Sequence, residues 1–192
     1  MKRVCVFCGA SSGRRAVYAD AARAFGATCA RRGLGVVYGG GRVGVMGVVA
    51  DAALAGRGEV VGVIPQELVD RELAHGGLTE LHVVASLHER KALMADLSDG
   101  FVALPGGFGT LDELAEQLTW SQLGLHAKPV GLLDVDGFWR PLVALARHMV
   151  DEGYVREADL RAVVVGDDPD ALLDALARVE PRRPKWSRPP KP

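Results

Sequence analysis

Cysteine is scarce in this 192-residue chain, and Cys5, Cys8 and Cys29 are too few for a disulfide framework. A small and odd number of cysteines agrees with a reducing compartment, so we expect the protein in the cytoplasm. Cys5 and Cys8 have the C-x-x-C spacing of redox proteins, but Cys5 lies inside a run typical of a β-strand, whereas a redox pair opens a helix. The sequence therefore favours structural thiols over a redox centre.

Long hydrophobic runs are also missing. No apolar run approaches the roughly 20 residues that a membrane-spanning helix needs. The opening Met1-Lys2-Arg3 leads into a short apolar strand rather than into the core of a signal peptide. Neither membrane insertion nor export is expected.

The chain has no excess of charge of one sign, because 23 basic and 24 acidic residues give a formal net charge of −1. Without a basic field, binding to nucleic acid or to an anionic membrane is not expected. An anionic ligand has to be bound by local groups.

The segment Pro181 to Pro192 differs from the rest of the chain. It holds five prolines, five basic residues and no acid. Without an apolar face it is expected to be a disordered or extended tail, and a solvated tail is favoured over one that contacts RNA or a partner. Residues 1–180, in a chain that is 48% hydrophobic, are expected to form a single domain.

Short β-branched runs alternate with helical periodicity along residues 1–180. Strands that are apolar on both faces are typical of a sheet buried between two helical layers. The alternation predicts an α/β fold, with a doubly wound open parallel sheet and helices on both faces, since the chain is short for an eight-fold barrel. The expected strands are 4–7, 36–38, 60–64, 81–84, 100–104, 130–133 and 162–165, and the expected helices are 16–32, 45–55, 87–98, 111–123, 139–152 and 169–178.

A glycine-rich segment, GGGRVGVMG at 39–47, follows a strand and opens a helix. Glycines let the backbone approach a ligand closely, and the helix start offers unpaired N–H groups to an anion. The segment lacks the Gly-Lys-Ser/Thr of a P-loop and the spacing of a dinucleotide fingerprint, which disfavours hydrolysis of a nucleoside triphosphate. Tight packing of helix against sheet is the alternative reason for these glycines.

A second such segment, PGGFGTLDE, runs from Pro105 to Glu113. Its three glycines and Thr110 at a helix start predict a nest of donors suited to one phosphate. No lysine or metal-ligand cluster accompanies it, so a monophosphate bound without metal or other cofactor is favoured. Glu113 is expected in the first helical turn, in range of the sugar that carries the phosphate; an acid that merely stabilises the helix start is the alternative.

The helix expected from 87 opens with Leu-His-Glu-Arg-Lys. Cations at a helix N-terminus oppose the helix dipole and therefore call for an anionic partner. Arg90 is expected to pair with Glu113 or with a substrate phosphate, although an unremarkable surface pair is equally compatible with its position.

The motif Pro-Gly-Gly-x-Gly-Thr-x-x-Glu at Pro105 to Glu113 resembles the signature of the LONELY GUY family. These are cytokinin riboside 5′-monophosphate phosphoribohydrolases, once described as lysine decarboxylases. The resemblance covers nearly all of the chain before the tail, since it extends to CVFCGASS at 5–12, YGGG at 38–41, GVMG at 44–47, HERK at 88–91 and TWSQLG at 119–124.

The resemblance implies a Rossmann-like fold and a homodimer whose interface helps to build each site. It also implies that Arg90 and Glu113 form the catalytic pair. The segment Ala74-His75-Gly76-Gly77 departs from the Thr-Gly-Glu pattern of the family, close to where its members hold the base. The substrate-binding residues implied are Gly40, Gly41, Gly44, Met46, Gly47, Glu72, Lys91, Gly107, Phe108, Gly109, Thr110, Leu111, Asp112 and Thr119.

The expected activity is hydrolysis of the N-glycosidic bond of adenosine 5′-monophosphate or of its N6-isoprenoid derivatives, without a cofactor or metal. Two alternatives stay open. A decarboxylase would need pyridoxal phosphate on a lysine, and only Lys91 lies in a candidate site. A nucleotide or cofactor carrier would use the same loops without cleaving anything.

Overall fold

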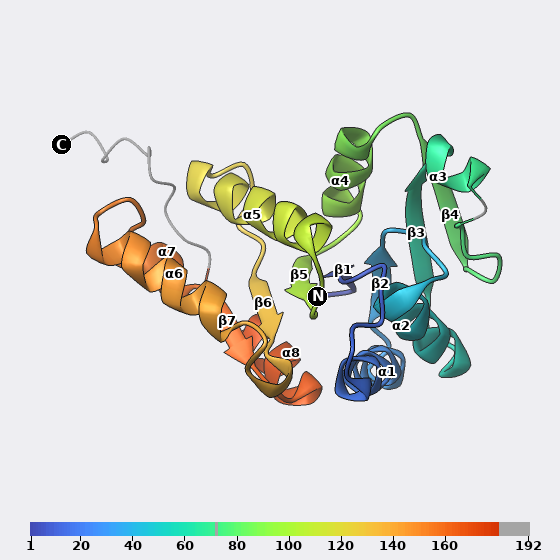
Figure 1. Cartoon of the computed structure of the whole chain (residues 1–192), viewed down its shortest axis with the longest axis horizontal. Coiled ribbons are helices and arrows are strands. Elements are labelled where there is room, and N and C mark those ends of the chain that lie inside the picture. Colours follow the sequence, from blue (N-terminus) through green and yellow to red (C-terminus); the bar gives the residue numbers. More distant parts are fainter. Residues whose placement is uncertain (72, 181–192) are drawn as a thin grey trace.

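A computed structural model describes residues 1–71 and 73–180. Seven strands form one sheet in the order β4-β3-β2-β1-β5-β6-β7 (Figure 1), and every neighbouring pair is parallel. The strands are β1 (Arg3–Phe7), β2 (Gly35–Tyr38), β3 (Val60–Pro65), β4 (Glu80–Val84), β5 (Gly100–Ala103), β6 (Val130–Leu133) and β7 (Val163–Gly166).

Helices cover both faces of the sheet. The core on one face packs α1, α2 and α8 against the strands, and the core on the other packs α4, α5 and the start of α6. The predicted Rossmann-like α/β fold, doubly wound and with helices on both faces, is confirmed. The helices are α1 (Ala16–Arg31), α2 (Gly44–Ala55), α3 (Gln66–Asp70), α4 (Leu87–Asp96), α5 (Phe108–Leu123), the 3-10 turn η1 (Val135–Gly137), α6 (Arg140–Asp151), α7 (Glu157–Arg161) and α8 (Pro169–Ala177).

The order of the strands reverses at β1. Val4 pairs with Val36 of β2 on one side and with Gly100 of β5 on the other. From β1 the chain winds outward through β2, β3 and β4, and from β5 it winds outward through β6 and β7. The loops after β1 and β5 therefore diverge, and this opens a crevice at the carboxyl edge of the sheet where ligands of such folds bind.

The two helices that border this crevice begin differently. At α4, the N-cap Ser86 accepts a hydrogen bond from the Glu89 N–H at 3.1 Å, and the Glu89 carboxylate accepts one from the N–H of Ala85, the residue before the N-cap, at 2.9 Å. At α5 the N-cap is Gly107, and no side chain caps the helix. Its first N–H groups are therefore left to another acceptor.

The structure corrects the start of α5, which was expected at 111. The helix begins at Phe108, because its first turn is built from residues whose glycine content reads as a loop in the sequence. Glu113 consequently lies in the second turn, not in the first, and it is not an acid that stabilises the helix start. The short helices α3 and α7 and the turn η1 were not predicted, since elements of three to five residues carry too little periodicity.

Cys5 and Cys8 lie on β1 and at its end, and both thiols are free and buried. Burial raises the pKa of each thiol, which disfavours the reactive thiolate.

Within the described part of the chain, no helix is long and apolar enough to cross a membrane. The tail expected at 181–192 lies outside the described residues.

Candidate active site

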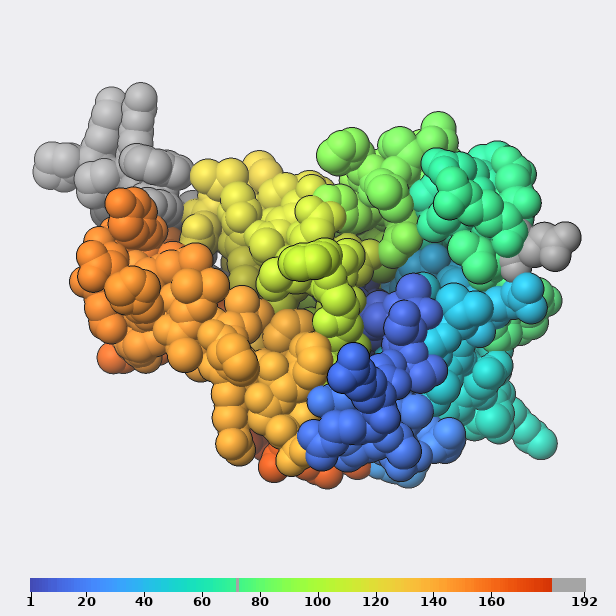
Figure 2. All heavy atoms as spheres, viewed as in Figure 1, coloured from blue at the N-terminus to red at the C-terminus, as the bar shows by residue number. Residues whose placement is uncertain are grey.

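A cavity of about 590 Å³ opens at the carboxyl ends of the central strands. The loops after β1, β2 and β5 surround it, together with α4 and the segment that follows β3 (Figures 1 and 2). Its size suits a nucleotide-like small molecule. Of the residues expected in the site, those that line this cavity are Gly41, Met46, Arg90, Gly107, Gly109, Thr110 and Glu113.

Arg90 and Glu113 form a buried ion pair in the wall of the cavity. The Arg90 Nη2 atom of α4 donates to Glu113 Oε1 of α5 across 2.5 Å, and Glu113 is only 7% exposed. Arg90 lies against Gly39 at the end of β2, where a Cβ atom would come within 2.6 Å of Nη2. A side chain at position 39 would therefore displace the guanidinium from its place in the pair.

The charge states in this pair are set by burial. Burial raises the pKa of the Glu113 carboxyl, and the charge of Arg90 and its hydrogen bond lower it without cancelling the rise. Arg90 Nε is buried and has no hydrogen-bond partner in the described structure. A carboxylate that accepts a proton readily, beside an unused donor, is an arrangement typical of acid–base chemistry on a bound ligand.

The start of α5 forms the second feature of the cavity. A Cβ atom at Gly106 would lie 2.1 Å from Thr110 Oγ1 and 2.8 Å from the Gly9 nitrogen, so only glycine permits this turn. At Gly107 and Gly109 a Cβ atom would meet nothing within 4 Å, because both residues face open space. The uncapped N–H groups and the helix dipole make this turn a site for an anion such as one phosphate.

The loop after β1, from Gly9 to Gly13, also lines the cavity. It is fastened to both glycine-rich loops, since the Gly9 N–H donates to Pro105 O and the Met46 N–H donates to Gly9 O, each at 3.2 Å. Gly44 has a φ of +61° and lies so close to Ala10 that a Cβ atom would be 2.3 Å from its carbonyl carbon. Three loops that contact one another therefore frame the cavity.

Sequence reasoning assigned no role to Ser11 and Ser12, which line the cavity within that first loop. The signal was available, because the small polar run Gly-Ala-Ser-Ser-Gly follows the strand at which the order of the sheet reverses.

An apolar wall was missed as well. Ile64 at the end of β3, Leu68 of α3 and Leu73 line the cavity beside Met46. No pattern in the sequence marked it, since α3 is too short to be recognised and Leu73 follows it in an irregular segment.

Several residues expected at the site through the family resemblance do not line the cavity. Gly40, with a φ of +70°, and Gly44 shape the loop after β2, and Gly47 packs against Arg42, whose carbonyl oxygen would lie 2.2 Å from a Cβ atom. Phe108, Leu111, Asp112 and Thr119 are exposed on the outer side of α5. Glu72 lies outside the described residues.

Lys91 points away from the cavity and braces α4 against α5. Its Nζ atom lies 2.8 Å from Asp112 Oδ2 and 3.1 Å from Glu116 Oε1. Burial lowers the pKa of Lys91, but the two carboxylates outweigh it and raise the pKa above its ordinary value. A charged lysine held in this way is a poor candidate for the Schiff base that a pyridoxal-dependent decarboxylase needs.

The reversal of strand order, the cavity at that point and the uncapped helix start define a Rossmann-like protein with a site sized for a nucleotide. The chain belongs to the family described as "Possible lysine decarboxylase", whose model matches residues 46–176. The resemblance recognised in the sequence is thereby confirmed.

Known relatives cover most of the chain. It is 48% identical over 164 residues to the cytokinin riboside 5′-monophosphate phosphoribohydrolase LOG of Oryza sativa subsp. japonica. The aligned residues make up 85% of this chain and 67% of the relative. An Arabidopsis thaliana protein of the same enzyme name is 46% identical over 180 residues, 94% of this chain and 83% of the relative.

Solved structures share the fold. The molybdenum cofactor carrier protein of Chlamydomonas reinhardtii matches with a TM-score of 0.70 and 22% identity, over 92% of this chain and 96% of that one. The molybdenum cofactor binding protein of Rippkaea orientalis matches with a TM-score of 0.69 and 21% identity over the same shares of the chains. At this level of identity the likeness concerns the fold alone.

Proposed function

We propose that the protein hydrolyses the N-glycosidic bond of adenosine 5′-monophosphates, including N6-modified ones, to the free base and ribose 5-phosphate. The observation that carries the proposal is the buried Arg90–Glu113 pair in the wall of a cavity whose neighbouring helix start is uncapped. The names of the two plant relatives support the choice of N6-modified adenine nucleotides.

The 5′-phosphate binds at the start of α5. Its charge faces the N–H groups after Gly107 and the positive end of the helix dipole, and the open space at Gly107 and Gly109 leaves room for its oxygens. Binding energy gained there holds the ribose in a fixed orientation beside the ion pair.

Glu113 acts on the sugar. As the bond between C1′ and the base nitrogen breaks, its electron pair leaves with the base, and the buried carboxylate stabilises the positive charge that develops on the ribose. Water adds to C1′, and Glu113 accepts the proton which that water loses and then returns it to solvent. The departing base takes up one proton from solvent, so that the products are the neutral base and ribose 5-phosphate. Arg90 holds the carboxylate in place, and its unpartnered Nε is free to bind a ribose hydroxyl.

The proposal includes a homodimer that packs through α5. Phe108, Ala115, Thr119 and Leu123 are spaced so that they fall on one stripe of this helix, and all four are exposed, Phe108 to 91%. An apolar stripe of this kind is typical of a protein interface. A partner protomer on this stripe would bring Phe108, Asp112 and Thr119 next to a site, as the family resemblance implies.

A cytoplasmic location also belongs to the proposal, and the three free thiols support it.

The test incubates the purified protein with adenosine 5′-monophosphate, with isopentenyladenosine 5′-monophosphate and with adenosine, and follows the free base by chromatography. We expect base from both nucleotides and far less from adenosine, which lacks the phosphate. Binding of the nucleotides without release of base would contradict hydrolysis and support a carrier.

A further inference from the structure

The segment Leu73–Gly77 is attached to the loop after β2 by one isolated antiparallel bridge and two backbone hydrogen bonds. The Arg42 N–H donates to Leu73 O and the His75 N–H donates to Gly40 O, each at 2.9 Å, and Ala74 forms an antiparallel bridge with Gly41. Leu73 and Gly41 both line the cavity. This attachment therefore holds Leu73 in the apolar wall of the cavity. The wall consists of Met46, Ile64, Leu68 and Leu73.

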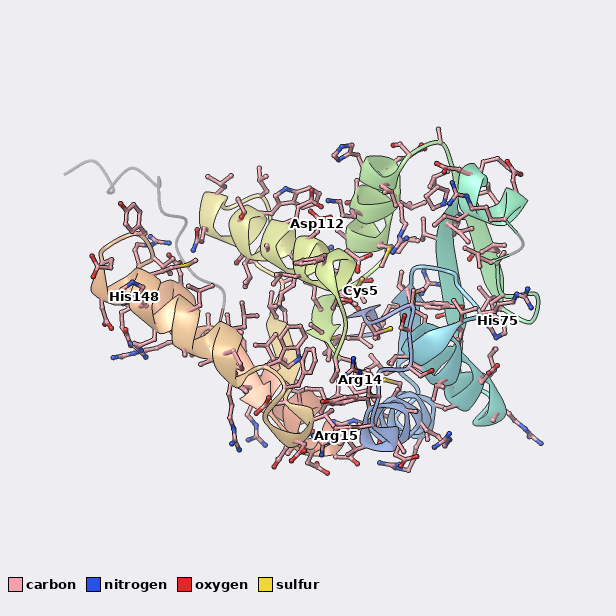
Figure 3. The ribbon with its side chains drawn as sticks, viewed as in Figure 1. Cys5, Arg14, Arg15, His75, Asp112 and His148 are labelled. Atoms are coloured by element: carbon pink, nitrogen blue, oxygen red, sulfur yellow. The ribbon has the colours of Figure 1, made fainter. Side chains whose placement is uncertain are left out.

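The side chain of His75 ties the same segment to α2. Its Nε2 atom lies 3.0 Å from Asp51 Oδ1 of α2, and the Gly77 N–H donates to its Nδ1 at 3.1 Å. Because Nδ1 accepts a hydrogen bond, the proton is on Nε2, which donates to Asp51. The imidazole side chain is only 12% exposed, on the side of the molecule where α2, β3 and β4 meet (Figure 3).

The apolar wall adjoins the catalytic pair. The point that a Cβ atom of Gly39 would occupy is 2.6 Å from Arg90 Nη2 and 3.4 Å from Met46 Sδ, so Arg90 and Met46 lie next to each other. A Cβ atom of Gly41 would lie 2.8 Å from Met46 Cε and 3.9 Å from Leu73 O. With the phosphate at the start of α5 and the ribose at the pair, the base extends toward this wall.

We propose that His75, although it does not touch the substrate, is a positioning residue that selects nucleotides with an apolar substituent on the base. Resting on the proposed function, the inference assigns Leu73 and Met46 to the contact with that substituent and the His75–Asp51 hydrogen bond to the placement of Leu73. Asp51 belongs to α2, the helix that also carries Met46. The His75–Asp51 hydrogen bond therefore sets the spacing between Leu73 and Met46, the two residues assigned to the substituent.

The test measures the affinities of adenosine 5′-monophosphate and isopentenyladenosine 5′-monophosphate by calorimetry, with Glu113→Gln present in every protein so that neither nucleotide is consumed. The protein with His75 is expected to prefer the isopentenyl compound, and His75→Ala is expected to reduce this preference about 10-fold, the size of effect that one displaced apolar contact produces. Affinity for the unsubstituted nucleotide should change little, since the contacts to phosphate and ribose remain. Binding does not require turnover, so the outcome is separate from that of the hydrolysis test.

Three variants separate positioning from general damage. Asp51→Ala should reproduce the His75→Ala effect, whereas Asp51→Asn should retain the wild-type preference because an amide oxygen still accepts from Nε2. His82→Ala is the matched control, since His82 also lies against a carboxylate, that of Glu80 at 3.1 Å, but belongs to β4, which pairs with β3 and not with the loop after β2. An unchanged preference in His75→Ala, or an equal loss of affinity for both nucleotides, would overturn the proposal.

Discussion

At the scale of single residues, Glu113 and Arg90 depend on each other. An isolated charge at either buried position costs several kcal/mol. The pair compensates for this cost only because the guanidinium and the carboxylate lie within hydrogen-bonding distance of each other. The remaining free donor of Arg90 and the raised pKa of Glu113 are properties that a purely structural ion pair does not need. We therefore expect substitutions here to separate binding from chemistry.

Glu113→Gln should retain nucleotide binding and lose turnover by about 100-fold or more, because the amide still accepts from Arg90 but cannot take a proton. Single-turnover kinetics and calorimetry measure the two quantities. Glu116→Gln is the matched control on the same helix, since Glu116 pairs with Lys91 and does not line the cavity. Full turnover in Glu113→Gln would remove Glu113 from the mechanism.

The pH dependence of turnover follows from burial of the same carboxyl. Burial raises the pKa of Glu113, so the carboxylate needed as a base is present above that raised value and is lost as the pH falls through it. The acid limb of kcat/KM, which reports the free protein, is therefore expected above the ordinary range of a glutamate. Stability changes with pH in the opposite direction to turnover. The folded state keeps the Glu113 proton up to a higher pH than the unfolded state, so the free energy of unfolding decreases as the pH rises from the ordinary glutamate pKa to the raised one. An acid limb at or below the ordinary glutamate range would contradict this assignment.

At the scale of elements, the start of α5 combines a lack of capping with exposed glycines. Gly109→Ala places a methyl group in space where the structure has no atom within 4 Å. Alanine in a helix is favoured over glycine by about 1 kcal/mol, so thermal unfolding should occur at the same or a higher temperature. The methyl group should nevertheless weaken binding of nucleoside monophosphates, because it enters the proposed phosphate position.

Calorimetry with adenosine 5′-monophosphate and with adenosine checks this prediction. A loss of affinity confined to the nucleotide is expected of Gly109→Ala. If both ligands lose affinity equally, the phosphate does not bind at this helix start.

The sequence predicted the long elements and the pairing of Arg90 with Glu113, because the segments that carry them leave local signals. Strands such as Val60–Pro65 are apolar on both faces, and the motif from Pro105 to Glu113 is contiguous. The apolar wall left no such signal, since Leu68 lies on the short helix α3 and Leu73 lies next to the single bridge between Ala74 and Gly41. A pairing between segments about 30 residues apart depends on tertiary contacts, which periodicity cannot reveal.

At the scale of the whole molecule, the exposed stripe of α5 predicts a dimer in solution. Leu123→Asp places a charge at the C-terminal end of this stripe and should shift the protein toward the monomer. Leu145→Asp on α6 is the control, because Leu145 is similarly exposed, 50% against 46%, but lies on another helix. Sedimentation velocity distinguishes these outcomes; a wild-type protein that sediments as a monomer would contradict the proposed dimer.

The central claim is that one cavity anchors a 5′-phosphate and exposes the neighbouring glycosidic bond to Glu113. The most direct measurement quantifies both products formed by the purified wild-type protein from isopentenyladenosine 5′-monophosphate. The account predicts free base and ribose 5-phosphate in equal amounts, with neither product from Glu113→Gln over the same period. Recovery of intact nucleotide, or formation of the nucleoside and inorganic phosphate in place of ribose 5-phosphate, would contradict it.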